Sequence, residues 1–246
     1  MKTKGDWITR LQKMRRNIYL QGEKIARDDE RMQTAIHTTG MTFDFAEKPE
    51  YADLLTATSH ITGEKINRFC HIHQNKVDLH KKQDMTRFLC QQVGGCIQRC
   101  MGIDATNAVS CVSFEADKVM KGTTEYYNNF LKWLRRFQEE NLVGCCAQTD
   151  VKGNRIQRPG QQKDPDAYVH VVERKSDGIV VRGCKTHITI APQADGRELF
   201  TECYESFEIL PFGPPPLHPG GRWAKISLFS IPLWITQNIQ ELGVHF

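Results

Sequence analysis

The sequence of 246 residues lacks a long apolar run, a block of basic residues and a secretory leader. Its longest apolar run, Ile226 to Ile235, contains Pro232 and is far shorter than the roughly 20 residues of a membrane-spanning helix. The 33 basic and 29 acidic residues are interspersed, and the net charge of +4 does not form a stripe for nucleic acid. The start, Met1 to Asp6, is polar and charged rather than a secretion signal. We therefore expect no membrane segment and no nucleic-acid partner.

Glycine-rich nucleotide-binding fingerprints are also missing. No segment matches the Walker pattern or the Rossmann dinucleotide pattern, which disfavours both folds. With 39% hydrophobic and 25% charged residues, the chain can bury a core in one large or two smaller domains. Its nine cysteines, without a leader, indicate the reducing cytoplasm, where thiols or metal ligands are favoured over disulfides.

Helical periodicity dominates the first part of the chain. Apolar residues recur at three- and four-residue intervals from Asp6 to Ile18, and the longest such stripe runs from Val77 to Met101. We expect Gly102 to interrupt this helix, helical structure to resume after it, and a further helix to begin with Thr123 as its N-cap. Residues 1–141 are therefore predicted to form a helical domain.

The periodicity changes to that of strands after Leu142, and residues 142–200 are predicted to form part of a β domain. The segments Tyr168–Glu173 and Ile179–Ile190 flank an Asp-Gly turn signal, which predicts a β-hairpin. Between Asp150 and Asp166, glycine, proline and polar residues predict a long ordered loop. The sequence thus indicates an α+β fold.

The last segment, residues 201–246, differs in composition from the rest. Six of the ten prolines fall between Pro211 and Pro232, so we expect no regular element through that stretch.

Two groups of residues could bind a metal. Cys96 and Cys100 are four residues apart on a predicted helix, so that both thiols would lie on one face and could supply two ligands. The alternative is that both pack as small hydrophobic side chains, because they continue an apolar stripe. Cys70, His71 and His73 are also close in sequence, although loop histidines are more often simply solvated.

The predicted loop also contains a group of residues suited to a nucleotide or flavin. A hydroxyl, a carboxylate, an ammonium, a flexible glycine and a guanidinium occur together at Thr149, Asp150, Lys152, Gly153 and Arg155. An ordinary polar turn would have the same composition.

A predicted strand further along the chain has one polar face. Within Lys185–Thr189, alternation places Lys185, His187 and Thr189 on the same side. This side could equally be the solvent face of a half-exposed sheet.

Several segments, taken in order, resemble one family. They are Tyr51–Leu54, Gly63–Phe69, Cys96–Ala108, Thr149–Arg155, Gln162–Asp166 and Asp177–Gly183. Together they resemble the 4-hydroxyphenylacetate 3-hydroxylase superfamily, and specifically its 4-hydroxybutyryl-CoA dehydratase branch, from about residue 3 to about residue 197. After Arg197 the resemblance ends. Our hypothesis is that the tail, residues 201–246, is not native family sequence but comes from a frameshifted or truncated reading frame, which resequencing the locus would test.

The resemblance implies an acyl-CoA dehydrogenase-like fold, with an N-terminal helical domain, a middle β domain and a C-terminal helical bundle that this chain lacks. It implies FAD bound by Thr149–Arg155 and by the strand around His187 and Thr189. It also implies a [4Fe-4S] cluster for which Cys96 and Cys100 supply two of four ligands. Family members are homotetramers that act on acyl-CoA substrates.

The family chemistry is radical dehydration of 4-hydroxybutyryl-CoA to crotonyl-CoA, with isomerisation of vinylacetyl-CoA. The resemblance implies that flavin accepts one electron while a cluster iron acts as a Lewis acid on the departing hydroxyl. Without the C-terminal half, we expect the chain to be inactive by itself. Two alternatives stay open: a flavin-dependent 4-hydroxyphenylacetate 3-monooxygenase, against which the cysteine pair argues, and a non-catalytic fragment.

Overall fold

The structure, a computed structural model, describes residues 1–121, 124–147, 149–175, 178–201 and 227–230. The chain divides into two compact units. The first comprises Met1–Cys146 with Thr189–Arg197, and the second comprises Ala147–Ile188 with Glu198–Phe246. Helices and small sheets are combined, which confirms the α+β class.

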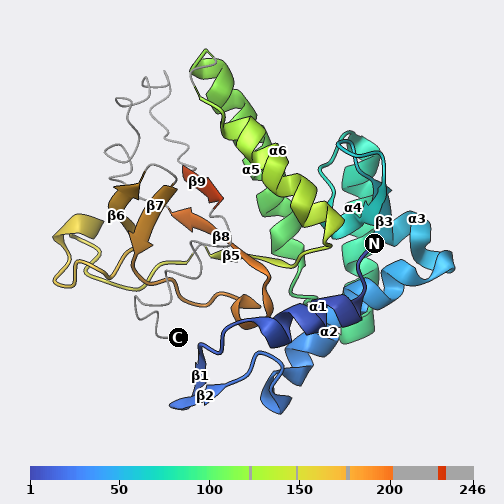
Figure 1. Cartoon of the computed structure of the whole chain (residues 1–246), viewed down its shortest axis with the longest axis horizontal. Helices are drawn as coiled ribbons and strands as arrows, with labels where there is room; N and C mark the ends of the chain where they lie inside the picture. Colours follow the sequence, from blue (N-terminus) through green and yellow to red (C-terminus); the bar gives the residue numbers. More distant parts are fainter. Residues whose placement is uncertain (122–123, 148, 176–177, 202–226, 231–246) are drawn as a thin grey trace. The chain divides into compact units, whose positions relative to one another are not determined.

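The first unit is mainly helical (Figure 1). Its α-helices are α1 (Lys4–Lys13), α2 (Gln33–Glu47), α3 (Ala52–Leu55), α4 (Lys76–Val93), α5 (Cys100–Val119) and α6 (Tyr126–Glu139). Its 3-10 helices are η1 (Glu30–Met32), η2 (Pro49–Tyr51), η3 (Arg68–Cys70) and η5 (Ala191–Gln193). Two antiparallel ribbons pair β1 (Ile18–Leu20) with β2 (Glu23–Ile25) and β3 (Thr56–Thr58) with β4 (Lys65–Asn67). No helix in the described part of the chain is long and apolar enough to cross a membrane.

The second unit contains the predicted hairpin. Strands β6 (His170–Lys175) and β7 (Gly178–Arg182) pair antiparallel, with an irregularity between Val171 and Glu173. The hairpin is therefore confirmed, although its second strand ends at Arg182 and not at Ile190. The turn residues 176–177 lie outside the described residues.

A further sheet corrects one expectation about the tail. Its strand order is β5 (Gly144–Ala147), β8 (Gly196–Thr201) and β9 (Ser227–Ser230). Strand β9 pairs antiparallel with β8, so the prediction of no regular element between Pro211 and Pro232 is wrong at these four residues. The segment Ser-Leu-Phe-Ser contains no proline, and its phenylalanine is a residue type enriched in strands. The rest of the predicted tail lies outside the described residues.

The predicted long helix from Val77 to Met101 is two helices. Helix α4 ends at Val93, and Gly94 follows it in the left-handed conformation, with φ of 69°. A residue without Cβ adopts this conformation at no steric cost, and it ends a helix. Helix α5 begins at Cys100 and continues through Gly102, so the expected interruption at Gly102 is wrong.

The limits of two other helices also differ from the sequence analysis. Helix α1 ends at Lys13, so Ile18 lies in a strand and not on the helix. Thr123, the expected N-cap of the next helix, lies outside the described residues. The carboxylate of Asp117 in α5 performs this role instead, since it accepts hydrogen bonds from the backbone N–H groups of Tyr126 at 3.0 Å and Tyr127 at 2.9 Å.

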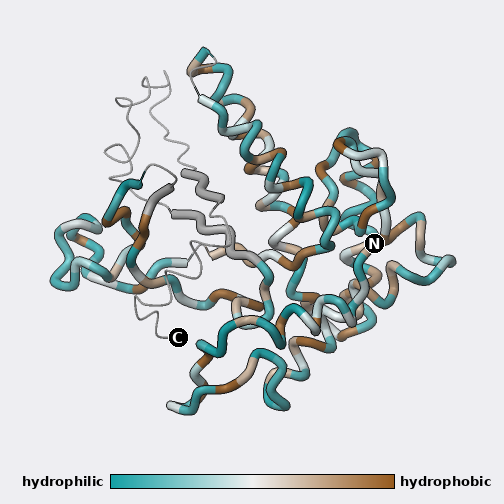
Figure 2. The backbone as a smooth tube through the Cα atoms, in the orientation of Figure 1, coloured by the Kyte–Doolittle hydropathy of each residue, from teal (hydrophilic) through white to brown (hydrophobic). Residues whose placement is uncertain are grey.

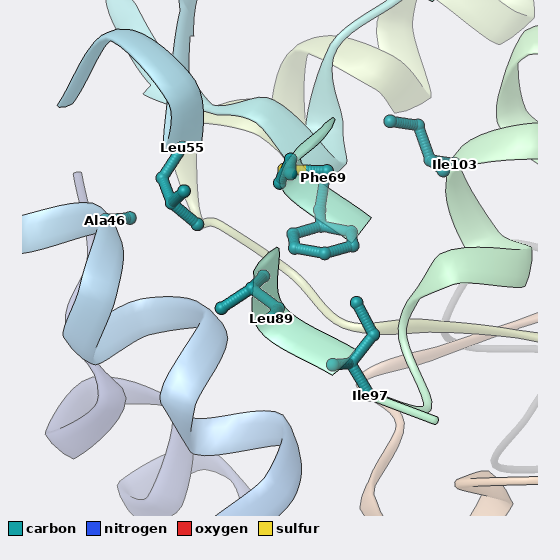
Figure 3. Packing of buried hydrophobic residues seen from close by; sticks show 7 residues of the cluster. Ala46, Leu55, Phe69, Leu89, Ile97 and Ile103 are labelled. Carbon is teal, nitrogen blue, oxygen red and sulfur yellow. The ribbon is translucent and has the colours of Figure 1, made fainter. Parts of the chain in front are cut away.

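The core of the first unit is a cluster of fully buried apolar side chains. It includes Ala46, Leu55, Phe69, Met85, Leu89, Ile97 and Ile103. Figure 3 shows side chains from several separate elements meeting around the ring of Phe69. Ile97 belongs to the irregular segment between α4 and α5 and is 0% exposed, so this segment is anchored in the core.

A buried arginine, Arg99, lies beside this cluster. Its guanidinium donates to Asn141 Oδ1 at 2.9 Å, to the carbonyl of Leu142 at 2.8 Å and to Thr42 Oγ1 at 3.0 Å. It also lies over the ring of Phe43, 4.7 Å from its centroid. Burial lowers the pKa of Arg99. Neutral acceptors from two distant parts of the chain therefore bind one buried cation.

The return segment, residues 189–197, closes the first unit. Asp195 is buried and receives two hydrogen bonds from Arg10, Nε to Oδ1 at 2.7 Å and Nη2 to Oδ2 at 3.0 Å. Its second oxygen also accepts from the backbone N–H of Val143 at 2.9 Å. Trp7 Nε1 donates to the carbonyl of Gln193 at 3.2 Å. Helix α1 is thus held by residues more than 180 positions later in the chain.

We predict that Asp117→Ala lowers the free energy of unfolding by about 1 kcal/mol, because α6 loses its N-terminal acceptor. The folded-state pKa of Asp117 is lowered; desolvation raises it, but hydrogen bonds from Thr124, Tyr127 and Tyr126 outweigh that effect. The contribution is therefore complete above the unfolded-state pKa, about 3.9, and is lost as the pH falls through the lower folded-state value. Urea unfolding at pH 7 and pH 3 measures this difference.

The matched control for that variant is Glu115→Ala on the same helix. Glu115 pairs only with exposed Lys118, so a change within about 0.5 kcal/mol is expected. Equal effects of the two variants at pH 7 would contradict the capping role of Asp117.

We also predict that Arg99→Met lowers the free energy of unfolding by about 3 kcal/mol or more, because three buried acceptors lose their donor. Exposed Arg135→Met on α6 is the control and should stay within about 0.5 kcal/mol of the wild type. Chemical denaturation compares them, and a loss below about 1 kcal/mol for Arg99→Met would show that the acceptors find other donors.

Candidate functional site

The two candidate thiols lie where α4 gives way to α5. Cys96 is exposed in the irregular segment, and Cys100 is the half-buried first residue of α5. The expectation that both lie on one face of a continuous helix is therefore wrong, because the chain leaves the helix at Gly94. Instead, side chains alternate: Ile97 and Arg99 are buried, while Cys96 is exposed and Gln98 is half-buried.

The local backbone holds the Cys96 thiol in a defined place. Gln98 has a positive φ of 60°, and its N–H donates to Cys96 Sγ at 3.3 Å. A backbone donor to sulfur is one of the interactions that tune cysteine ligands of iron–sulfur clusters. Among the described residues, however, no group of three or more His, Cys, Asp or Glu side chains could hold a metal ion. Two thiols are thus the most that this segment offers.

Cys70 and His71 are buried and His73 is half-buried, and the described residues form no group of metal ligands around them. Cys70 is fully buried, and burial raises the pKa of its thiol to about 11, so that it stays protonated at neutral pH. His71 is also buried, with Nε2 3.1 Å from Asp78 Oδ2. The expectation of a solvated histidine is wrong for His71, because η3 places this segment in the core.

The candidate flavin loop is anchored by a buried ion pair in the second unit. Lys185 Nζ lies 2.6 Å from Asp150 Oδ1, and Lys185 is only 5% exposed. The backbones of Asp150 and Lys185 also form an isolated antiparallel bridge, and the N–H of Thr186 donates to the carbonyl of Thr149 at 2.9 Å. The structure thereby brings Thr149 and Asp150 beside the segment that leads to His187.

The remaining loop candidates are accessible. Lys152 and Arg155 are exposed, as is Thr149, and Gly153 between the two cations is half-buried. Figure 2 shows mainly hydrophilic residues along this loop. Apart from the short η4 (Pro159–Gln161), the loop from residue 149 to residue 169 contains no helix or strand in its described residues. The predicted long ordered loop is confirmed.

The segment around His187 is not a strand. His187 has a positive φ of 58° and is exposed, and Thr189 is an exposed turn residue. Lys185, expected on the same face, is buried, so the predicted polar strand face is wrong. Thr189 moreover belongs to the first unit, whereas Thr149–Arg155 and His187 belong to the second. The left-handed conformation of His187 ends the extended backbone, so the side chains no longer alternate between two faces.

Two residues that were not among the predicted cofactor-binding residues hold the loop. Lys185 compensates the charge of Asp150, and Gln162 makes hydrogen bonds to the backbone of Asn154. Burial of a lysine has no local sequence signal. Gln162 did open one of the family-like segments, which was the available signal.

The comparisons agree on one family. The model of the 4-hydroxyphenylacetate 3-hydroxylase N-terminal domain matches residues 3–204. The chain is 43% identical over 189 residues to the 4-hydroxybutyryl-CoA dehydratase/vinylacetyl-CoA-Delta-isomerase of Clostridium aminobutyricum, covering 76% of this chain and 38% of that protein. The chain thus spans well under half the length of this relative.

Solved structures give the same result. An oxygen-tolerant archaeal 4-hydroxybutyryl-CoA dehydratase from N. maritimus is similar with a TM-score of 0.75 and 36% identity, covering 80% of this chain and 39% of that one. The oxygenase component of 4-hydroxyphenylacetate 3-monooxygenase complexed with FAD has a TM-score of 0.65 at 22% identity, covering 84% and 42%, which shows a shared fold alone. By its sequence and its fold, the chain belongs to the 4-hydroxyphenylacetate 3-hydroxylase family and matches the N-terminal part of its members.

Proposed function

We propose that this chain is the N-terminal portion of an FAD- and [4Fe-4S]-dependent 4-hydroxybutyryl-CoA dehydratase with vinylacetyl-CoA isomerase activity. The observation that carries the proposal is the 43% identity to the clostridial dehydratase over most of this chain. The exposed Cys96 thiol and the anchored loop at Asp150 support it, because both offer groups of the required chemistry. The acyl-CoA dehydrogenase-like arrangement, the acyl-CoA substrate and assembly as a homotetramer belong to the same proposal.

The loop residues fit FAD by the chemistry of their donors. Exposed Lys152 and Arg155 provide cationic hydrogen-bond donors for a pyrophosphate, and Thr149 provides a hydroxyl. Asp150, fixed by Lys185, can accept from a flavin N–H or a ribose hydroxyl. His187 and Thr189 are exposed and complete the proposed set. These residues bind and orient, and bound flavin would supply one-electron chemistry that no side chain provides.

Cys96 and Cys100 fit half of a cluster site. Soft thiolates are the usual ligands of iron–sulfur clusters, and a cubane takes four ligands as a rule. The described residues offer no third ligand beside them, so the remaining ligands belong to residues outside the described part or to another chain. Because the chain matches only the N-terminal part of its relatives, we expect no dehydratase activity from the 246 residues alone.

Two other functions would give different results in the same experiments. A flavin monooxygenase of the family would bind FAD and need no iron. A non-catalytic fragment would bind neither cofactor. Iron and flavin content therefore separate the three proposals.

We predict that the wild-type chain binds FAD and that the double variant Lys152→Ala, Arg155→Ala binds it roughly tenfold more weakly or worse, because charge-assisted hydrogen bonds contribute about 1.5–3 kcal/mol each. Equilibrium ultrafiltration with FAD absorbance measures the dissociation constant. Lys163→Ala is the control, since Lys163 is an exposed cation of the same loop outside the proposed set. Equal affinity of the double variant and the wild type would exclude this loop as the binding site of FAD.

We further predict that chain purified without oxygen retains iron and that the double variant Cys96→Ala, Cys100→Ala loses it. The measurement is the ultraviolet–visible spectrum with iron and flavin quantification. Cys111→Ala, which removes another exposed thiol of α5, is the control and should keep the wild-type iron content. Flavin without iron in the wild type would favour the monooxygenase, and iron unaffected by the double variant would exclude these thiols as ligands.

A further inference from the structure

The loop that carries Lys152, Gly153 and Arg155 has little regular structure, so something else must define its backbone. Asp150 fixes only its first residues, through the ion pair with Lys185. Asn154 is followed by exposed residues as far as Arg158. A loop of this length without further ties would sample many conformations, and binding a ligand would then require ordering it.

One side chain, Gln162, provides these ties. Its Oε1 accepts from the N–H of Asn154 at 2.9 Å, and its Nε2 donates to the carbonyl of the same residue at 3.0 Å. The amide therefore pairs with both backbone groups of Asn154, as a neighbouring strand would. The two N–H groups of Nε2 are shared among three carbonyls, since Nε2 also lies 3.1 Å from the carbonyl of Gln157 and 3.3 Å from that of Arg158. A single amide thus fixes the loop at three points.

The amide of Gln162 also packs against Gly153. A Cβ atom placed on Gly153 would lie 2.3 Å from Gln162 Oε1 and 3.5 Å from Tyr168 Cε2. The backbone at Gly153 therefore passes directly over the amide group. Gly153 lies between Lys152 and Asn154, so the position of Gln162 determines the course of the chain on both sides of it.

We propose that Gln162 is a positioning residue for the cofactor: it holds the backbone of residues 153–158 so that Lys152 and Arg155 are presented together to the pyrophosphate of FAD. The proposal rests on the proposed FAD binding and adds to it the residue that pre-organises the site. Gln162 need not touch the cofactor, because its amide is already engaged with the backbone of Asn154, Gln157 and Arg158.

Two substitutions test the role of the amide. Gln162→Glu keeps the shape but removes both N–H donors and brings a negative charge to three carbonyls. Gln162→Ala removes the whole side chain. The matched control is Gln157→Ala, a glutamine of the same loop whose side chain makes none of these bonds and is exposed.

Two readouts on the full chain distinguish positioning from general stability. Trypsin cleavage after Lys152 and Arg155, followed by mass spectrometry, reports local opening of the loop. Ultrafiltration reports the FAD dissociation constant, and the melting temperature reports global stability. For both Gln162 variants we expect roughly tenfold faster cleavage at these two sites and roughly tenfold weaker FAD binding, with the control unchanged and the melting temperature within a few degrees of the wild type.

The outcomes distinguish the anchoring of the loop by Gln162 from its effect on FAD binding. Faster cleavage with unchanged FAD affinity would overturn the positioning role and leave Gln162 as a loop anchor only. Unchanged cleavage would overturn the anchor itself. Failure of the wild-type chain to bind FAD would overturn the proposed function and, with it, the cofactor role of Gln162, whereas the cleavage rates would still decide whether the amide holds the loop.

Discussion

The burial of Arg99 is the constraint on which the first unit depends. A guanidinium has five donors and a fixed charge, and each donor needs an acceptor once water is removed. Its acceptors come from α2, through Thr42, and from the turn after α6, through Asn141 and Leu142. No carboxylate among the described residues forms an ion pair with it. All acceptors must therefore be in place together, which couples segments far apart in the sequence.

This constraint also explains how the Cys96 thiol is displayed. Ile97 and Arg99 are buried in the core, so the alternating residues Cys96 and Gln98 lie toward the surface. A cysteine ligand on a freely moving loop would lose conformational entropy when it binds a metal. Here Ile97 and Arg99, which follow Cys96 in the same segment, have already lost their conformational entropy during folding. The buried arginine thus connects the stability of the helical unit to the position of a candidate ligand.

The parts of the fold that were predictable are those with a local signal. The hairpin followed from alternation around an Asp-Gly pair, and the α+β class followed from the change of periodicity. The break between α4 and α5 was missed although Gly94 and Gly95 marked it, because the apolar stripe continued across them. The burial of Lys185 and the backbone contacts of Gln162 arise only from tertiary structure, and the left-handed conformation of His187 is uncommon for a residue other than glycine. An ordered set of motifs located the candidate site in the sequence, but the geometry of the site could not be predicted.

The pairing of Arg10 with Asp195 has a consequence for synthesis of the chain. Helix α1 can pack the indole of Trp7 on Phe43 early, since the centroids of these two stacked rings lie 5.4 Å apart. Its charged partner, Asp195, is made much later, after residues 147–188. Until then Arg10 of a nascent chain is without this carboxylate. Contacts of such long sequence separation form slowly, so we expect the docking of α1 against residues 189–197 to be a late step in the folding of this unit.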